Sequence, residues 1–107
     1  MSEPLKAERP AIRPETRAMI DRLIAFDTTS RNSNLELIHD IRDYLAEHGV
    51  DACLVHDEDG RKANLYATVG PADRPGIALS GHTDVVPIDN QDWTRDPWKV
   101  SAEQGRL

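Results

Sequence analysis

The chain has 107 residues, of which 38% are hydrophobic and 30% are charged, and its formal net charge is −6. This length suffices for one small domain. The acidic balance argues against nucleic acid as a partner, because binding phosphates requires clustered Lys and Arg. No apolar run approaches the roughly 20 residues that a membrane helix needs, so no membrane partner is expected. The single cysteine, Cys53, cannot form an internal disulfide, which fits a reducing, cytoplasmic location.

Two helices are predicted in the first half of the chain. Residues 1–13 are polar and contain two prolines, which is typical of a flexible leader. Pro14 then suits the first turn of a helix, because its missing N–H would have no partner there. The apolar residues that follow recur at helical spacing and lie on one face of the predicted helix: Met19, Ile20, Leu23 and Ile24.

The second helix is predicted over about residues 34–48. Ser33 and Glu36 have the spacing of a capping box, in which each side chain can satisfy a free backbone N–H of the first turn. Gly49 suits the left-handed conformation that ends many helices. The apolar stripe of this helix consists of Leu37, Ile38, Ile41, Tyr44 and Leu45.

Three strands are predicted next, over residues 50–57, 64–70 and 76–81. A short acidic turn containing a glycine joins the first two, which favours a hairpin. Cys53 lies inside the first apolar run, so we expect a buried, unreactive thiol. Two helices followed by three strands, one of them almost wholly apolar, predict an α/β fold in which helices cover a mixed sheet.

The last segment, residues 93–107, has the pattern of a strand, a turn over residues 103–105 and the start of another strand. A finished domain rarely stops on a newly started strand, because the pairing groups of that strand would be left open. We therefore expect residues 14–107 to be an incomplete N-terminal portion of a larger domain, preceded by the leader over residues 1–13.

One histidine and one acid lie two positions apart where the third predicted strand ends. Residues i and i+2 of a strand point to the same side, so His82 and Asp84 are expected to project together. A carboxylate that accepts the imidazole N–H fixes the tautomer that a metal-bound histidine needs. The alternative is an ordinary surface histidine, since one imidazole falls short of the three or four ligands of a zinc site. The other histidines do not complete such a site and are expected at the surface: His39, His48 and His56.

The segment "LSGHTDVVPIDNQDWTRDPW", residues 79–98, resembles the first metal-binding segment of the zinc-dependent aminoacylase and carboxypeptidase family. The family pattern is an apolar strand, a Gly-His-x-Asp-Val-Val-Pro motif, and a loop with Trp and Asp-Pro-Phe or Asp-Pro-Trp. The upstream stretch "LIAFDTTSRNSNLELI", residues 23–38, is similar to the acetylornithine deacetylase branch of that family. The resemblance covers the chain from Thr16 onward.

The resemblance implies a zinc-exopeptidase-like catalytic domain with two Zn²⁺ or Co²⁺ ions. It makes His82 a ligand of one metal ion. It makes Asp84 the catalytic-site carboxylate that orients this imidazole. The bridging aspartate, the glutamate that acts as general base and the remaining ligands would follow Leu107. No substrate-binding residue is assigned.

The activity that the resemblance implies for a full-length parent is hydrolysis of N2-acetyl-L-ornithine to L-ornithine and acetate, a step of arginine biosynthesis. The partner would be a small N-acylated amino acid, and a homodimeric parent is one option. The fragment alone is expected to be inactive. Two alternatives stay open: a non-catalytic α/β binding module, and within the family a succinyl-diaminopimelate desuccinylase or dipeptidase.

Overall fold

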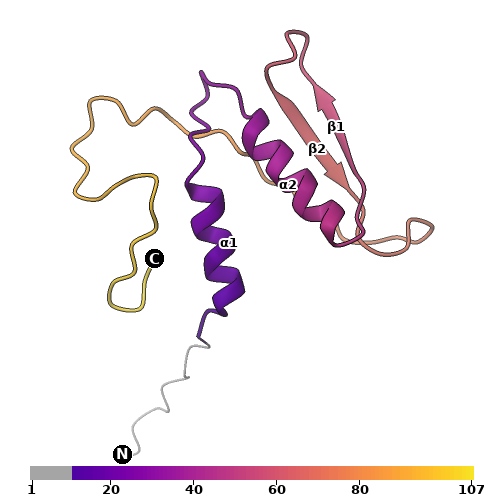
Figure 1. Cartoon of the computed structure of the whole chain (residues 1–107), viewed down its shortest axis with the longest axis horizontal. Helices are drawn as coiled ribbons and strands as arrows, with labels where there is room; N and C mark the ends of the chain where they lie inside the picture. Colours follow the sequence, from indigo (N-terminus) through magenta and orange to yellow (C-terminus); the bar gives the residue numbers. More distant parts are fainter. Residues whose placement is uncertain (1–10) are drawn as a thin grey trace, which may run out of the picture.

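The computed structural model describes residues 11–107, so most of the predicted leader lies outside the described residues. Residues 11–13 of that leader form neither helix nor strand. Two helices and two strands follow in chain order (Figure 1): α1 Pro14–Ile24, α2 Leu35–Glu47, β1 Ala52–His56 and β2 Ala63–Ala67. Within the described part of the chain, neither helix has the length and apolar character needed to cross a bilayer.

The two helices occupy the predicted segments. Proline stands at the start of α1 as expected. A bidentate ion pair joins α1 to α2, with Arg22 Nε 2.7 Å from Asp40 Oδ2 and Arg22 Nη2 2.6 Å from Asp40 Oδ1. Paired N–H···O bonds of this kind fix orientation as well as distance, so they set how the helices lie against each other.

The start of α2 agrees in part with the predicted capping box. Asn34, not Ser33, precedes the helix, and no side chain caps the first turn from that position. The Ser33 hydroxyl accepts the N–H of Leu35 at 3.1 Å and donates to the carbonyl of Arg61. The capping prediction is therefore confirmed for Ser33, whose hydroxyl also joins the helix start to the hairpin turn.

The end of α2 is as predicted. Gly49 has a φ of 77°, in the left-handed region that favours glycine. The N–H of Gly49 bonds the carbonyl of Ala46 at 3.0 Å, and the N–H of Val50 bonds the carbonyl of Leu45 at 2.9 Å. These two bonds define a Schellman motif, which satisfies the last carbonyls of the helix and turns the chain toward β1.

Strands β1 and β2 form the predicted antiparallel hairpin, in a register that places Leu54 opposite Leu65. Helix α2 packs on the hairpin (Figure 1), and the alternating burial of the strands places these leucines on the covered face. The apolar residues buried in the described part of the chain lie at this junction: Leu37, Ile38 and Ala63. The small core therefore joins one helix to one face of one hairpin.

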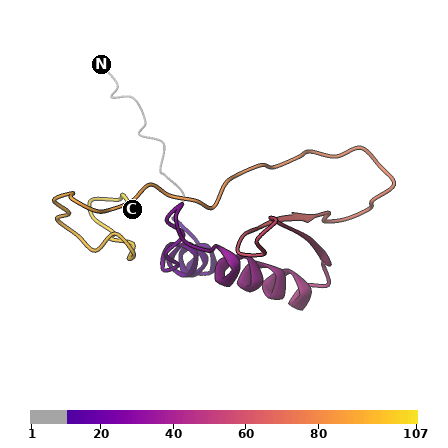
Figure 2. The ribbon, with the colours of Figure 1, turned by 90° about the horizontal axis from the view of Figure 1, so that it is seen from above.

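The predicted third strand does not form. Residues 76–81 are assigned to no strand, and Figure 2 shows this segment following an open arc away from α2 and the hairpin. Ile77 is 92% exposed and Leu79 is 95% exposed. A strand that is apolar on both faces needs an edge to pair with and a layer on each face, and this segment has neither here. The sheet is two-stranded and antiparallel, which corrects the prediction of a mixed sheet.

The uncovered face of the hairpin also corrects the prediction for Cys53, whose thiol is exposed. Cys53 lies opposite Tyr66 in the register, and Tyr66 is 72% exposed. Alternate residues of a strand point to opposite faces, and α2 covers only the other face.

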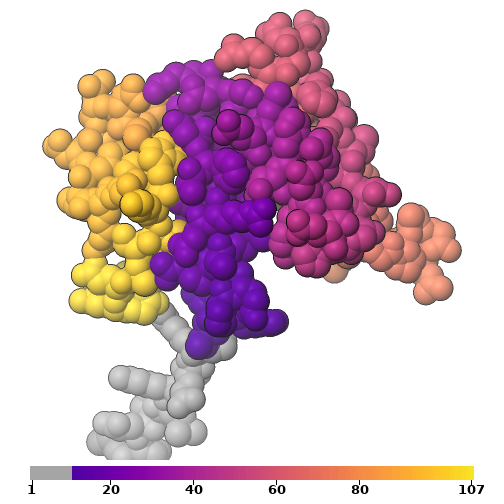
Figure 3. Space-filling view, viewed as in Figure 1, coloured from indigo at the N-terminus to yellow at the C-terminus, as the bar shows by residue number. Residues whose placement is uncertain are grey.

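The C-terminal segment, residues 86–107, lies against α1, as Figure 3 shows in orange and yellow beside indigo. Arg17 Nη2 lies 3.4 Å from the carbonyl oxygen of Val100. The predicted turn over residues 103–105 is present, closed by an isolated bridge between Glu103 and Arg106. The strand predicted before it is absent.

Candidate functional site

A compact loop between the helices forms the base of the candidate site. The Asp27 carboxylate accepts the N–H of Thr29 at 3.0 Å and its hydroxyl at 2.6 Å. These hydrogen bonds lower the pKa of Asp27 below its usual value, because they favour the charged form. Thr28 and Thr29 are only 7% and 1% exposed, which is unusual for threonines in a connecting loop. The loop is therefore held in one conformation by its own side chains.

The segment that carries His82 is attached to this loop. The N–H of Val85 bonds the carbonyl of Thr28 at 3.2 Å, and the N–H of Ser30 bonds the carbonyl of Val85 at 3.0 Å. The Thr28 hydroxyl also donates to the carbonyl of Thr83 at 2.6 Å. Thr29 and Val85 thus form an isolated parallel bridge, which fixes the backbone on both sides of Asp84.

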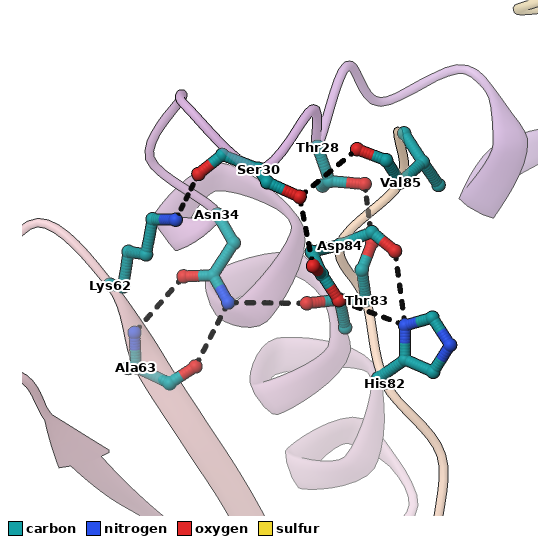
Figure 4. Close-up of polar contacts among 9 residues, drawn as sticks. All are labelled: Thr28, Ser30, Asn34, Lys62, Ala63, His82, Thr83, Asp84 and Val85. Atoms are coloured by element: carbon teal, nitrogen blue, oxygen red, sulfur yellow. Dashed lines mark hydrogen bonds and ion pairs between the residues drawn. The ribbon is translucent and has the colours of Figure 1, made fainter. Parts of the chain in front are cut away.

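Asn34 joins this segment to the hairpin (Figure 4). Its side-chain amide accepts the N–H of Ala63 and donates to the carbonyl of the same residue, both at 3.0 Å. The amide also donates to the hydroxyl of Thr83 at 3.2 Å. The Thr83 side chain therefore faces Asn34, while the His82 ring lies on the far side of the segment (Figure 4). This is the alternation that the sequence predicts.

Replacing Asn34 by alanine is expected to lower the free energy of unfolding by about 1–3 kcal/mol, because it leaves the polar groups of Ala63 without partners. The amide proton of Ala63 should then exchange faster with solvent, which hydrogen-exchange NMR measures. Asn32→Ala is the matched control in the same loop. Equal protection of the Ala63 amide in the wild type and the Asn34 variant contradicts this role.

His82 and Asp84 meet as predicted, although no regular strand carries them. His82 Nδ1 lies 2.9 Å from Asp84 Oδ1 and 3.0 Å from the backbone oxygen of Asp84. Both neighbours are acceptors, so we assign the imidazole proton to Nδ1. The Ser30 hydroxyl donates to the other carboxylate oxygen of Asp84, at 2.8 Å. These two hydrogen bonds, that from Ser30 first, lower the pKa of Asp84 below its usual value.

The arrangement leaves Nε2 of His82 free to face an incoming ligand. The His82 side chain is 83% exposed, and within residues 11–107 its only hydrogen-bond partner is Asp84. An imidazole with one nitrogen held by a carboxylate and the other open has the donor chemistry of a zinc ligand. The described residues therefore fit one ligand of a metal ion.

The described residues do not form a complete metal site by themselves. Among residues 11–107, no three His, Cys, Asp or Glu side chains lie close enough together to hold an ion. Of the other three histidines, His56 lines a second pocket together with His82, between the hairpin and residues 80–84. His39 and His48 belong to α2 and its C-terminal cap, and His56 ends β1 in an exposed position. His48 and His56 are exposed as predicted, whereas His39 is half-buried.

An apolar pocket of about 460 Å³ borders His82 on the side of the helices. Trp93 and Trp98, which close the family-like segment, both line it, and Trp93 remains 53% exposed. The other apolar walls come from the two helices, the loop after α1 and the segment after Asp84: Leu23, Ile24, Phe26, Leu37, Ile41, Val86 and Ile88. The imidazole thus stands at the edge of a hydrophobic surface.

Sequence reasoning missed Ser30. The loop over residues 27–34 reads as a capping and turn segment, and no spacing links Ser30 to Asp84, which lies 54 positions further along the chain. Only the similarity of this stretch to a family pattern singled the loop out.

The chain resembles several curated proteins. It is 35% identical over 80 residues to a probable succinyl-diaminopimelate desuccinylase of Staphylococcus epidermidis, covering 74% of this chain and 19% of that protein. It is 36% identical over 84 residues to the acetylornithine deacetylase of Proteus mirabilis, covering 78% of this chain and 21% of that protein. It is 35% identical over 101 residues to the acetylornithine deacetylase of Pasteurella multocida, covering 88% of this chain and 26% of that protein.

No protein-family model and no solved structure matches the chain. The chain spans about a fifth to a quarter of the length of these three relatives, 19–26%. The chain is thus a homologue of proteins named acetylornithine deacetylase and succinyl-diaminopimelate desuccinylase, and the resemblance predicted from residues 79–98 is confirmed.

Proposed function

We propose that residues 14–107 are the N-terminal portion of a metal-dependent amidohydrolase that converts N2-acetyl-L-ornithine to L-ornithine and acetate. Two relatives that carry the name acetylornithine deacetylase support this reaction. The structural observation that carries the proposal is the His82–Asp84 pair, in which one ring nitrogen is held at 2.9 Å and the other is open.

In this proposal His82 supplies one ligand, through Nε2, to one of two Zn²⁺ or Co²⁺ ions, and the remaining ligands lie outside these 107 residues. Such ions, when bound, polarise the amide carbonyl and lower the pKa of water. The donor set of the described residues agrees with a shared site, because one imidazole alone cannot close one.

The described residues have three tasks in this reaction. Asp84 accepts the Nδ1 proton of His82, which keeps the imidazole neutral and aims its other nitrogen outward. The loop over residues 27–30 fixes the position of Asp84 by its backbone bonds to Val85 and by the bond from the Thr28 hydroxyl to the carbonyl of Thr83. The apolar pocket beside His82 places hydrophobic side chains along one side of the imidazole.

Desuccinylation of N-succinyl-diaminopimelate is the second candidate, because the desuccinylase relative is similarly close at 35% identity. The two substrates differ in the acyl group, since succinate carries an additional carboxylate and acetate does not. Comparing kcat/KM for both substrates in the full-length protein decides between them, and we expect the acetylated substrate to be preferred.

The 107-residue chain by itself is expected to show no measurable deacetylation when Zn²⁺ or Co²⁺ is added, because residues 11–107 hold no complete set of metal ligands. Acetate release from N2-acetyl-L-ornithine measures this directly. The positive control is the full-length protein that carries these residues, under the same metal concentrations. Turnover by the short chain at a rate close to that of the full-length protein contradicts the shared site, and an inactive full-length protein contradicts the proposed reaction.

A further inference from the structure

We propose that Ser30 is a positioning residue: its hydroxyl holds the Asp84 carboxylate in the orientation that fixes the tautomer of His82. The inference deepens the proposed function and rests on it for its importance in catalysis. The hydrogen-bond relay itself is a property of the chain without metal. In it, Asp84 Oδ2 accepts a hydrogen bond from the Ser30 hydroxyl, and Asp84 Oδ1 accepts one from the Nδ1–H of His82 (Figure 4).

The single hydroxyl proton of Ser30 has two acceptors within reach. Asp84 Oδ2 lies at 2.8 Å, and the backbone oxygen of Val85 lies at 3.2 Å. The carboxylate is nearer and carries a charge, and hydrogen bonds to ionised acceptors are shorter and about twice as strong as neutral ones. The Val85 oxygen already accepts the N–H of Ser30. The proton therefore goes to Asp84.

Ser30 is itself fixed from both sides. Its N–H bonds the carbonyl of Val85 at 3.0 Å, and its own carbonyl accepts a hydrogen bond from the Lys62 ammonium, which comes from the hairpin turn. With the backbone of Ser30 and that of Asp84 held in one framework, the hydroxyl has a constant direction to the carboxylate. Asp84 is half-exposed, with 58% of its side chain accessible, so without this bond its carboxylate can rotate into solvent.

A second serine in the same loop provides a matched comparison. The Ser33 hydroxyl bonds the N–H of Leu35 and the carbonyl of Arg61, and it makes no hydrogen bond to Asp84. Removing the Ser33 hydroxyl loosens the loop without touching the relay. Removing the Ser30 hydroxyl breaks the relay directly.

The test is the tautomer of His82 in the metal-free chain, read from the ¹⁵N chemical shifts of its two ring nitrogens. The chain is labelled with ¹⁵N-histidine and measured at about pH 9, where histidine side chains are generally neutral. His82→Gln assigns the signal among the four histidines. In Ser30→Ala we expect the ratio of the Nδ1–H to the Nε2–H tautomer to fall by about threefold or more, which is the effect of one lost hydrogen bond.

Ser30→Thr retains a hydroxyl and should keep the wild-type ratio, and Ser33→Ala should keep it as well. An unchanged ratio in Ser30→Ala overturns the proposal. An equal fall in Ser30→Ala and Ser33→Ala also overturns it, because the effect then comes from the loop as a whole. Folding of each variant is checked by the backbone amide spectrum.

The same variants in the full-length protein separate the inference from the proposed function. We expect Ser30→Ala to bind Zn²⁺ about tenfold more weakly in competition with a chromophoric chelator, the lower end of the loss seen when a hydrogen-bond partner of a ligand is removed. If the tautomer ratio falls but the full-length protein neither binds metal nor deacetylates, the proposed function fails and the relay stands. If His82 proves essential while the ratio is unaffected by Ser30→Ala, the relay fails and the function stands.

Discussion

His82→Ala should reduce deacetylation of N2-acetyl-L-ornithine by the full-length protein by more than about 100-fold. Removing a hydrogen-bond partner of a metal ligand typically costs 10- to 100-fold, so removing the ligand itself should cost more. We expect the metal content to fall from two ions per chain toward one, as measured by atomic emission after dialysis against metal-free buffer.

The stability of the fold should be unaffected by this substitution. The His82 side chain is 83% exposed, and in the described part of the chain it bonds only Asp84. Exposed positions of this kind change the free energy of unfolding by less than about 0.5 kcal/mol. The control is His56→Ala, which removes another exposed imidazole at the end of β1. Two ions per chain and wild-type turnover in the His82 variant contradict the ligand assignment.

The elements that follow from local signals could be predicted from the sequence. Pro14 and Gly49 mark helix ends by their own backbone geometry, and both are found there. The hairpin follows from two apolar runs and the short turn between them. Such signals act over a few residues, so these elements form without contacts to residues distant in the sequence.

The third strand could not be predicted in the same way. An apolar run such as that over residues 76–81 forms a strand only beside a partner strand and between covering layers. Neither is supplied here, and Ile77 and Leu79 stand almost fully exposed. The same dependence on non-local packing explains the error for Cys53, since burial of a strand face depends on what lies above it.

For the candidate site, spacing predicted that His82 and Asp84 project together, and the structure confirms it. The pairing needs only alternation over three residues, so it is present even without a regular strand. The contacts of Ser30 and Asn34 could not be predicted from such spacing. The partner of Ser30 lies 54 positions away, and those of Asn34 lie 29 and 49 positions away. Contacts of this range are set by how the loop and the hairpin fold together.

Asp84→Asn should lower both metal affinity and kcat of the full-length protein by about 10- to 100-fold. The carboxylate presents acceptors to two donors, His82 Nδ1 and the Ser30 hydroxyl. An amide has one oxygen, which accepts, and one NH2 group, which donates. Either the ring N–H or the Ser30 hydroxyl must therefore face the NH2 group, with which it cannot form a hydrogen bond. If the NH2 group faces the ring, the imidazole places its proton on Nε2, and that nitrogen can no longer bind a metal ion.

Asp89→Asn is the matched control, because it removes the same charge from the same segment at an exposed ion pair with Arg31. Exposed pairs contribute little, so this variant should retain wild-type affinity and turnover. Metal affinity is measured by chelator competition, and turnover by acetate release. The backbone oxygen of Asp84, 3.0 Å from Nδ1, still accepts the ring proton in part of the molecules. The loss should therefore be smaller than that of His82→Ala, and a loss of equal size would show that the carboxylate does more than orient the imidazole.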